Sequence, residues 1–268
     1  MATNQIRFDN GAAYERYMGK WSQLAGDIFV GWLAPQSGLR WLDVGCGNGA
    51  FTELLVERCA PRSVDGIDPS APQIAFALTR PGTREVRFRE ADAMALPFAA
   101  DTFDAAVMPL VIFFVPEPAR GVAEMVRVVC PGGTVAAYTW DMIGGGFPYH
   151  ALRNEMRTMG VRAPEPPSLD SSRIDIMQDL WIDAGLEAVE TREISVQRTF
   201  ADFDDYWTTV RMGSSVGPPL AAMPRKEIAQ LEARMRECLP TDSAGRITSG
   251  ARANAVKGRV PGARTGAA

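Results

Sequence analysis

One short stretch, residues 39–51 (LRWLDVGCGNGAF), restricts what this chain can fold into more than any other part of it. An apolar run ends in a glycine-rich turn, and a helical pattern follows from Ala50, which predicts a buried strand, a tight turn and the start of a helix. Gly45 and Gly47 let a ligand approach the backbone, and N–H groups at a helix N-terminus bind acidic groups. Asp43 adds a negative charge where the strand ends. The turn is therefore expected to bind a molecule with both a carboxylate and a cation, such as an amino acid.

The run from Asp43 to Gly49 (DVGCGNG) resembles the first motif of class I S-adenosylmethionine-dependent methyltransferases. The dinucleotide fingerprint G-x-G-x-x-G/A is formally satisfied as well, so a nicotinamide-dependent oxidoreductase is an alternative. Asp68 fits both alternatives, because either ligand carries a ribose diol. Asp43 favours the methyltransferase, since a carboxylate beside the turn repels a pyrophosphate.

Three further features match this family in the expected order along the chain: Asp68 after the second predicted strand, Asp92 after the third, and the turn 131–133 (PGG) before the fifth. The resemblance implies that S-adenosylmethionine is the cofactor. It also implies that Asp68 binds the ribose and that Asp92 accepts a hydrogen bond from the adenine amino group. The cofactor-binding residues expected on this basis are Asp43, Gly45, Cys46, Gly47, Asp68, Pro69, Asp92, Ala93, Met108 and Tyr17.

Strand and helix patterns alternate along the chain, and with the resemblance they predict an α/β, Rossmann-like fold. The expected sheet has seven strands in the order 3-2-1-4-5-7-6, the last one antiparallel, with helices on both faces and a helical insertion between strands 6 and 7. The strands are expected at residues 41–44, 63–68, 84–89, 103–108, 134–140, 187–200 and 246–259.

A single domain is expected over residues 1–260, followed by a flexible tail at 261–268. Within it we expect an N-terminal helical segment (1–36) and a cofactor-binding half (37–141). Two insertions, 142–172 and 201–245, are expected to form a cap over the substrate. In the N-terminal segment, Tyr14, Tyr17 and Trp21 share one helical face, which is typical of core packing. The resemblance adds that this helix closes over the cofactor, with Tyr17 in contact.

The residues after the fourth strand indicate a small-molecule acceptor. Relatives that methylate exocyclic amines of nucleobases carry an Asp/Asn-Pro-Pro-aromatic turn there, but this chain has Met108-Pro109-Leu110-Val111. Phe113 and Phe114 stand where many small-molecule relatives place histidines, which suggests an apolar or aromatic acceptor; core packing is the alternative. The cofactor half resembles the ubiquinone/menaquinone-biosynthesis type. We expect the substrate wall to include Trp140, Phe147 and Trp207.

The identity of a catalytic residue stays open at this stage. An activated methyl donor leaves the protein mainly positioning and the exclusion of water. His150, the only histidine, is a weak candidate for a general base, because it lies in a predicted insertion after the fifth strand. A relative that binds the cofactor without methylating anything, and serves as a partner or regulator, is the alternative function.

Composition narrows the classes of partner. A net charge of −4 and a pI near 5.2 argue against general nucleic-acid binding. The four cysteines have no metal-ligand spacing and form no disulfide framework, so no metal is expected and a cytoplasmic location is the default. The longest uncharged apolar run, 105–116, is too short to span a membrane. The sequence does not indicate an oligomeric state.

Overall fold

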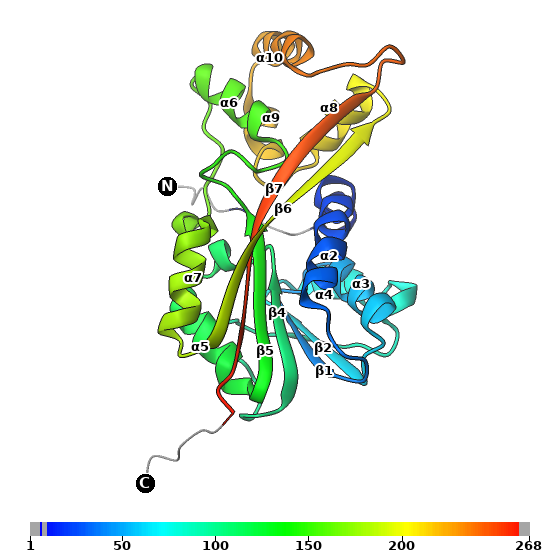
Figure 1. Cartoon of the computed structure of the whole chain (residues 1–268). Coiled ribbons are helices and arrows are strands. Elements are labelled where there is room, and N and C mark those ends of the chain that lie inside the picture. Colours follow the sequence, from blue (N-terminus) through cyan, green and yellow to red (C-terminus); the bar gives the residue numbers. More distant parts are fainter. Residues whose placement is uncertain (1–5, 7–9, 263–268) are drawn as a thin grey trace.

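The computed structural model of this chain describes residue 6 and residues 10–262. Its centre is a seven-stranded sheet in the order β3-β2-β1-β4-β5-β7-β6 (Figure 1), which confirms the predicted order. Strands β1 to β5 are parallel, and β7 is antiparallel to both of its neighbours. The strands are β1 (Arg40–Val44), β2 (Ser63–Asp68), β3 (Arg87–Glu90), β4 (Phe103–Pro109), β5 (Val129–Trp140), β6 (Glu187–Phe200) and β7 (Ile247–Arg259).

Helices cover both faces of the sheet and create two separate cores. Helices α2 (Lys20–Leu33) and α3 (Ala50–Cys59) lie on one face, and α5 (Pro118–Val128) and α7 (Ile174–Asp183) lie on the other (Figure 1). Successive strand residues point to opposite faces, so Trp41 joins the first core while Leu42 joins the second. Both faces of the inner strands β1 and β4 are buried, which explains their mostly apolar sequences.

The hairpin of β6 and β7 is longer than the rest of the sheet and carries a cap. β5 ends at Trp140 opposite Ala253, whereas residues 247–252 have β6 as their only partner among the seven strands of the sheet. The cap consists of α6 (His150–Thr158), α8 (Phe203–Arg211), α9 (Gly217–Ala222) and α10 (Arg225–Cys238), gathered around the far end of this hairpin (Figure 1). Helix α8 begins where the Asp202 side chain accepts a hydrogen bond of 2.8 Å from the Asp205 N–H.

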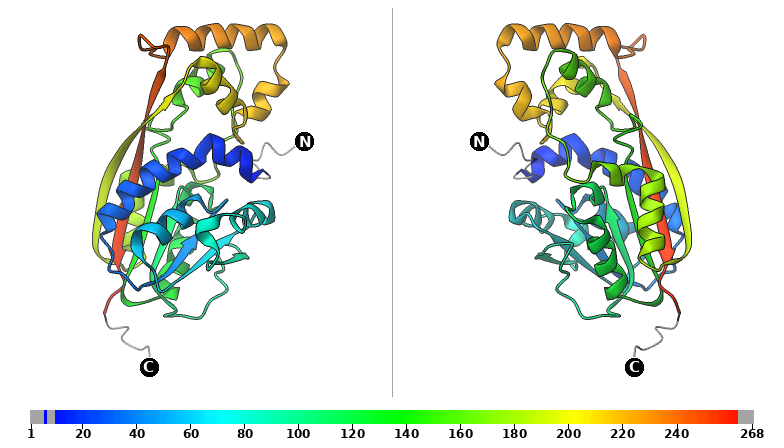
Figure 2. Two further views of the ribbon diagram at one scale, coloured as in Figure 1. Left: turned by 90° about the vertical axis from the view of Figure 1, so that its right-hand side faces the viewer. Right: turned by 90° about the vertical axis from the view of Figure 1, so that its left-hand side faces the viewer.

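The N-terminal helical segment lies between the sheet and the cap (Figure 2). It consists of α1 (Gly11–Tyr14), a π-helical turn η1 (Glu15–Gly19) and α2, and it begins where Asn10 caps the Ala13 N–H at 2.9 Å. Its cap side is tied down, because the Arg198 guanidinium donates to the Arg16 carbonyl oxygen at 3.1 Å. Short π-helical turns are frequent at functional sites.

Four short helical elements complete the connections. Helix α4 (Ala71–Ala77) follows β2, and the 3₁₀ turns are η2 (Pro81–Thr83), η3 (Ile112–Phe114) and η4 (Leu169–Ser172). Strand β3 begins at Arg87, three residues later than predicted, because η2 and the turn after it occupy the residues just before it.

Strand β5 begins five residues earlier than predicted, at Val129. Gly132 and Gly133 do not interrupt it, since the Gly132 N–H donates to the Val260 carbonyl oxygen at 2.8 Å and the pair is absorbed as an irregularity in the ladder. Of the predicted flexible tail, residues 263–268 lie outside the described residues.

Within residue 6 and residues 10–262, no helix is long and apolar enough to cross a membrane. All four cysteines are free thiols. No group of three or more His, Cys, Asp or Glu side chains in this part of the chain is placed to hold a metal ion.

Candidate functional site

The glycine turn between β1 and α3 has a backbone that few other residues tolerate. Gly45 and Gly47 have φ angles of +75° and +52°. A Cβ atom on Gly45 would lie 2.4 Å from a methyl carbon of Val111, whereas one on Gly47 would meet no atom within 4 Å. The turn therefore packs directly against Val111 at Gly45, whereas space is open beside Gly47.

The donors of this turn are used differently from the sequence-based expectation. The N–H groups of Gly45 and Cys46 both donate to the Ile67 carbonyl oxygen at 2.8 Å, and the Gly47 N–H donates to Asp68 Oδ2 at 3.0 Å. These three donors are satisfied inside the protein, so the idea that they hold a ligand carboxylate is not supported. Their role is to join the ends of β1 and β2.

A cavity of about 430 Å³, here called the large cavity, opens at the carboxyl ends of β1, β2 and β4. Ligands of open α/β sheets bind at this edge. Its walls include six of the predicted cofactor-binding residues and three residues from other elements: Asp43, Gly45, Cys46, Gly47, Asp68, Pro69, Tyr14, Leu110 and Phe114.

Asp43 is the most deeply buried acid of the large cavity, with no exposed surface. Its Oδ2 accepts a hydrogen bond of 2.6 Å from the Thr52 hydroxyl, and its Oδ1 has no partner among the residues described. The pKa of this carboxyl is raised to about 7, mainly by burial; the Thr52 hydroxyl lowers the pKa and the negative charge of Asp68 raises it. An unpaired buried acceptor of this kind is costly unless a ligand cation or donor satisfies it.

Asp68 lies at the end of β2 on the wall of the same cavity. It accepts backbone hydrogen bonds from Ser70 at 2.8 Å and from Gly47 at 3.0 Å. Burial raises the pKa of Asp68, and these two hydrogen bonds lower it. A carboxylate has about four acceptor sites, so Asp68 can still accept further hydrogen bonds from a ligand diol.

Arg80 ties the N-terminal segment to the glycine turn. Its guanidinium is 9% exposed, and it donates to the Asn48 carbonyl oxygen at 2.6 Å and to Glu53 at 2.9 Å. It also pairs with Glu15, whose carboxylate accepts a hydrogen bond of 2.7 Å from the Asn48 amide. Because Glu15 follows Tyr14 directly, this network places Tyr14 on the cavity wall. Burial and the nearby charges of Asp68 and Glu15 raise the pKa of the Tyr14 phenol above its ordinary value.

A second cavity of about 40 Å³, the narrow cavity, adjoins the large one. The two share walls at Ile6, Tyr14, Leu110 and Phe114, and the narrow cavity is otherwise lined mostly by apolar and aromatic side chains, among them Tyr17, Met18, Phe113, Trp140, Met142 and Phe147. Leu110, at the boundary, has φ +60°, which is a rare conformation for a bulky residue. Such strain is found at binding and active sites.

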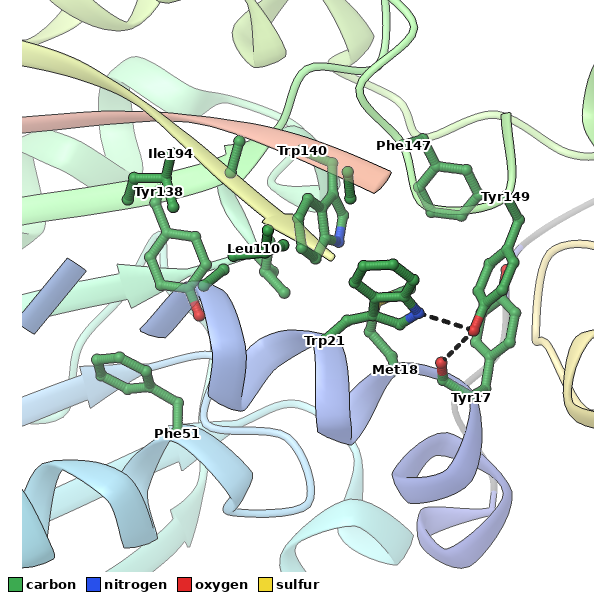
Figure 3. Close-up of a cluster of buried hydrophobic side chains, with 14 of the residues drawn as sticks. Tyr17, Met18, Trp21, Phe51, Leu110, Tyr138, Trp140, Phe147, Tyr149 and Ile194 are labelled. Atoms are coloured by element: carbon green, nitrogen blue, oxygen red, sulfur yellow. Dashed lines mark hydrogen bonds between the residues drawn. The ribbon is translucent and has the colours of Figure 1, made fainter. Parts of the chain in front are cut away.

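A buried aromatic cluster shapes the narrow cavity (Figure 3). Trp21 donates from Nε1 to the Tyr149 hydroxyl at 3.0 Å, and that hydroxyl donates to the Tyr17 carbonyl oxygen at 2.7 Å. The rings of Tyr17 and Tyr149 stack with centroids 4.6 Å apart. These contacts join the N-terminal helix to the segment after β5 in the wall of the narrow cavity.

The structure brings together most of the predicted site residues, with exceptions that have clear causes. Tyr17, which was expected beside the cofactor, lies on the wall of the narrow cavity. Tyr14 lines the large cavity in its place. Met108 is fully buried in the core on the α5 side, because strand alternation turns it away; its neighbour Pro109 lines the large cavity instead. Trp207 stacks on Phe203 in the cap and lines neither cavity.

Asp92 and Ala93 lie beyond the walls of both cavities. Asp92 is exposed, and its Oδ1 accepts a hydrogen bond of 2.8 Å from the Met94 N–H. The preceding residue, Ala91, donates to the Asp68 carbonyl oxygen at 3.2 Å, so this segment begins beside Asp68. His150 lines neither of the two cavities described so far; its Nε2 is 2.8 Å from the Asn154 amide nitrogen.

Sequence reasoning did not select Leu110, Arg80 or Arg153, all of which shape the site. Arg80 and Arg153 are single basic residues on ordinary helical or turn patterns, and nothing in the pattern shows which way they point. The location of Leu110 directly after β4, at the edge where ligands bind, is the signal that could have selected it.

Comparison with known proteins agrees with this geometry. A family model described as a methyltransferase domain matches residues 42–137. The demethylmenaquinone methyltransferase of Renibacterium salmoninarum is 30% identical over 173 residues, which cover 61% of this chain and 67% of that enzyme. The chain therefore belongs to the class I S-adenosylmethionine-dependent methyltransferases, whose cofactor is S-adenosylmethionine.

Other relatives match over shorter lengths. A chloroplastic 2-methyl-6-phytyl-1,4-hydroquinone methyltransferase of Oryza sativa subsp. japonica is 40% identical over 127 residues, covering 47% of this chain and 35% of that enzyme. Across several other curated relatives the chain spans 43–51% of their length. A solved structure of the Haemonchus contortus phosphoethanolamine N-methyltransferase 2 in complex with S-adenosyl-L-methionine has a TM-score of 0.56 at 15% identity, covering 93% of this chain and 56% of that one. The last likeness shows the fold alone.

Proposed function

We propose that this protein transfers the methyl group of S-adenosylmethionine to a small molecule whose reacting part is apolar or aromatic. The observation that carries the proposal is the pair of adjoining cavities: a large one with two acids at the strand ends, and a narrow one with aromatic walls. A cofactor in the former and an acceptor in the latter meet at the shared wall of Tyr14, Leu110 and Phe114.

The residues of the large cavity fit the cofactor by chemistry. The unpaired Oδ1 of Asp43 suits an ammonium group, and the carboxylate of Asp68 suits a pair of ribose hydroxyls. Gly47 leaves open space where a side chain would stand. We place the adenine end along the segment that leads to Asp92 and Ala93. S-Adenosylmethionine supplies an electrophilic methyl group on a sulfonium, so the protein needs to position the partners and exclude water.

In this proposal the narrow cavity positions the methyl acceptor. Trp140 and Phe147 offer flat apolar walls, and Phe113 and Phe114 of η3 line the same cavity. The named relatives act on a phytyl hydroquinone and on demethylmenaquinone, both with aromatic or quinoid rings. An acceptor ring held between such walls has few orientations, which raises the fraction of encounters that lead to reaction.

Calorimetry with S-adenosylhomocysteine, followed by an assay of S-adenosylhomocysteine formation, tests this proposal. We expect binding, and turnover with at least one phenol or quinol from a panel that also contains amines. No heat on titration overturns the assignment of the large cavity. Binding without turnover across the panel favours a cofactor-binding regulator instead, and stabilisation by a nicotinamide dinucleotide alone favours an oxidoreductase.

A further inference from the structure

A third cavity, of about 430 Å³, adjoins the narrow cavity. It shares Met142, Phe147 and Arg153 with the narrow cavity, so a ligand can extend from one into the other. The rest of its wall comes from α6, from residues 161–165 and from residue 169. We call it the basic cavity, because it is lined by Arg153, Arg157 and Arg162.

The charge of the basic cavity is opposite to that of the whole chain. Three arginines and one acid, Glu165, line it, although the chain as a whole carries a net charge of −4. His150 adds no charge near neutral pH, because burial and the positive charges of Arg157 and Arg153 lower its pKa. The nearby Asp141 is held by Arg252 in an ion pair. The cavity therefore has an excess of positive charge.

Among the three arginines of the basic cavity, Arg153 is the most buried, and its ion pair is long. Its side chain is 15% exposed, and Glu165, its one ion-pair partner in the described part of the chain, lies 3.8 Å away with 65% of its own side chain exposed. The guanidinium lies 5.7 Å from the centre of the Phe147 ring. A largely buried cation with such a distant partner is costly, and burial lowers the pKa of Arg153. A bound anion supplies the missing partner.

Arg157 and Arg162 face the same cavity from the surface. Arg157 donates to the Asn154 side-chain oxygen at 2.7 Å, and neither arginine forms an ion pair with any residue that the structure describes. Guanidinium groups present paired donors that match the geometry of a carboxylate or a phosphate. Three of them around one cavity form a receptor for an oxyanion.

We propose that the methyl acceptor carries a carboxylate or a phosphate, which binds in the basic cavity at Arg153, Arg157 and Arg162 while the apolar reacting part occupies the narrow cavity. Phe147 separates the two parts and contacts both. This inference rests on the proposed function, which it narrows to acceptors that are aromatic or apolar at one end and anionic at the other.

The experiment uses the full chain saturated with S-adenosylhomocysteine and four small probes. Phenyl phosphate and phenylacetate combine a ring with an anion, benzyl alcohol has the ring alone, and inorganic phosphate has the anion alone. Calorimetry is expected to show at least about tenfold tighter binding of one anionic aromatic probe than of either single-feature probe. A preference for phenyl phosphate identifies a phosphate-bearing acceptor, and a preference for phenylacetate identifies a carboxylate-bearing one.

Paired variants locate the binding. Arg157→Gln/Arg162→Gln removes two exposed charges from the basic cavity, and the matched control Arg62→Gln/Arg84→Gln removes two exposed charges elsewhere. The first pair is expected to lower the affinity for the anionic aromatic probe about tenfold and to leave benzyl alcohol unchanged. The control pair is expected to change neither.

Two results overturn the inference: equal binding of anionic and neutral aromatic probes (including no measurable binding of either), or equal loss in both variant pairs. S-Adenosylhomocysteine affinity, measured for every variant, keeps the two proposals apart. If it is intact while the anionic probes fail, only the acceptor inference is wrong. If it is absent from the unaltered chain, the proposed function is wrong as well.

Discussion

The large cavity and the basic cavity have similar volumes but are built in opposite ways. The large cavity is acidic, and its two aspartates stand at strand ends in a backbone fixed by hydrogen bonds between β1 and β2. The basic cavity depends on arginine side chains of a cap helix and the loop after it. The first therefore follows from the fold, whereas the second can change without disturbing the sheet. One domain can keep its cofactor site and vary its acceptor in this way.

The largest effect is expected at Gly45 in the wall of the large cavity, because this position of the glycine turn leaves no room for a side chain. Gly45→Ala combines a positive φ with a contact of 2.4 Å to Val111. Together these are expected to destabilise the protein by about 2–5 kcal/mol, as measured by urea denaturation. Exchange of the exposed Arg157 and Arg162 for Gln is expected to change stability by less than about 0.5 kcal/mol.

Gly38→Ala is the matched control for this prediction. Gly38 has φ +78° but no atom within 4 Å of the new Cβ, so it measures backbone strain without the clash. Gly45→Ala/Val111→Ala is expected to recover part of the loss. An equal cost at positions 45 and 38 contradicts a tightly closed turn.

The second prediction concerns the pH dependence of ligand binding in the large cavity. Because burial raises the pKa of Asp43 to about 7, the carboxyl is protonated below that pH and cannot pair with an ammonium group. Affinity for S-adenosylhomocysteine is expected to fall as pH decreases below 7, by up to about tenfold per unit. In Asp43→Asn the affinity is expected to be weaker and its pH dependence to disappear. Calorimetry at pH 5.5 to 8 measures both. If the variant keeps the pH dependence of the unaltered chain, Asp43 is not the group that causes it.

The same carboxyl should make the free protein less stable at high pH. Its folded-state pKa lies above the ordinary value of about 3.9, so its contribution to stability is complete below pH 4 and is lost as pH rises to about 7. Asp104 and Glu124 act in the opposite direction, because arginine partners lower their pKa values. The informative quantity is therefore the difference between Asp43→Asn and the unaltered chain, which is expected to grow from pH 5 to pH 8 in favour of the variant.

The contrast between the two cavities also explains which parts the sequence could predict. The large cavity depends on residues at the ends of strands. The alternating patterns and the glycine turn indicated where these strands end, and the resemblance to the methyltransferase family implied their order, so Asp43 and Asp68 could be placed in advance. Met108 was misplaced because an error of one residue along a strand reverses the face. Arg153 could not be identified, since its position depends on how α6 packs against α10, which is distant in the sequence. Trp207 looked like a wall residue because burial in the cap and exposure to a cavity give the same apolar pattern.

The third prediction tests whether the two acids after β2 and β3 are equivalent. Asp68→Ala is expected to weaken S-adenosylhomocysteine binding by roughly 1–3 kcal/mol, the range for hydrogen bonds to a charged group. Asp92→Ala is expected to weaken it by less than about 0.5 kcal/mol, because Asp92 is exposed and lies outside the cavity walls. Calorimetry on both variants decides the matter. Equal losses show that the 91–93 segment moves onto the cofactor when it binds.

The smallest effect expected is that of salt, and it compares the two cavities directly. Exposed charges are screened over about 10 Å at 0.1 M ionic strength, whereas a pair that involves a fully buried group is screened much less. Raising the salt concentration from 0.05 to 0.5 M is expected to weaken the binding of phenyl phosphate several-fold, because Arg157 and Arg162 are exposed. S-Adenosylhomocysteine binding is expected to change by less than about twofold, since Asp43 has no exposed surface. Equal salt dependence for the two ligands means that their charges are solvated alike, which contradicts the placement of either the ammonium group at Asp43 or the anion at the surface arginines.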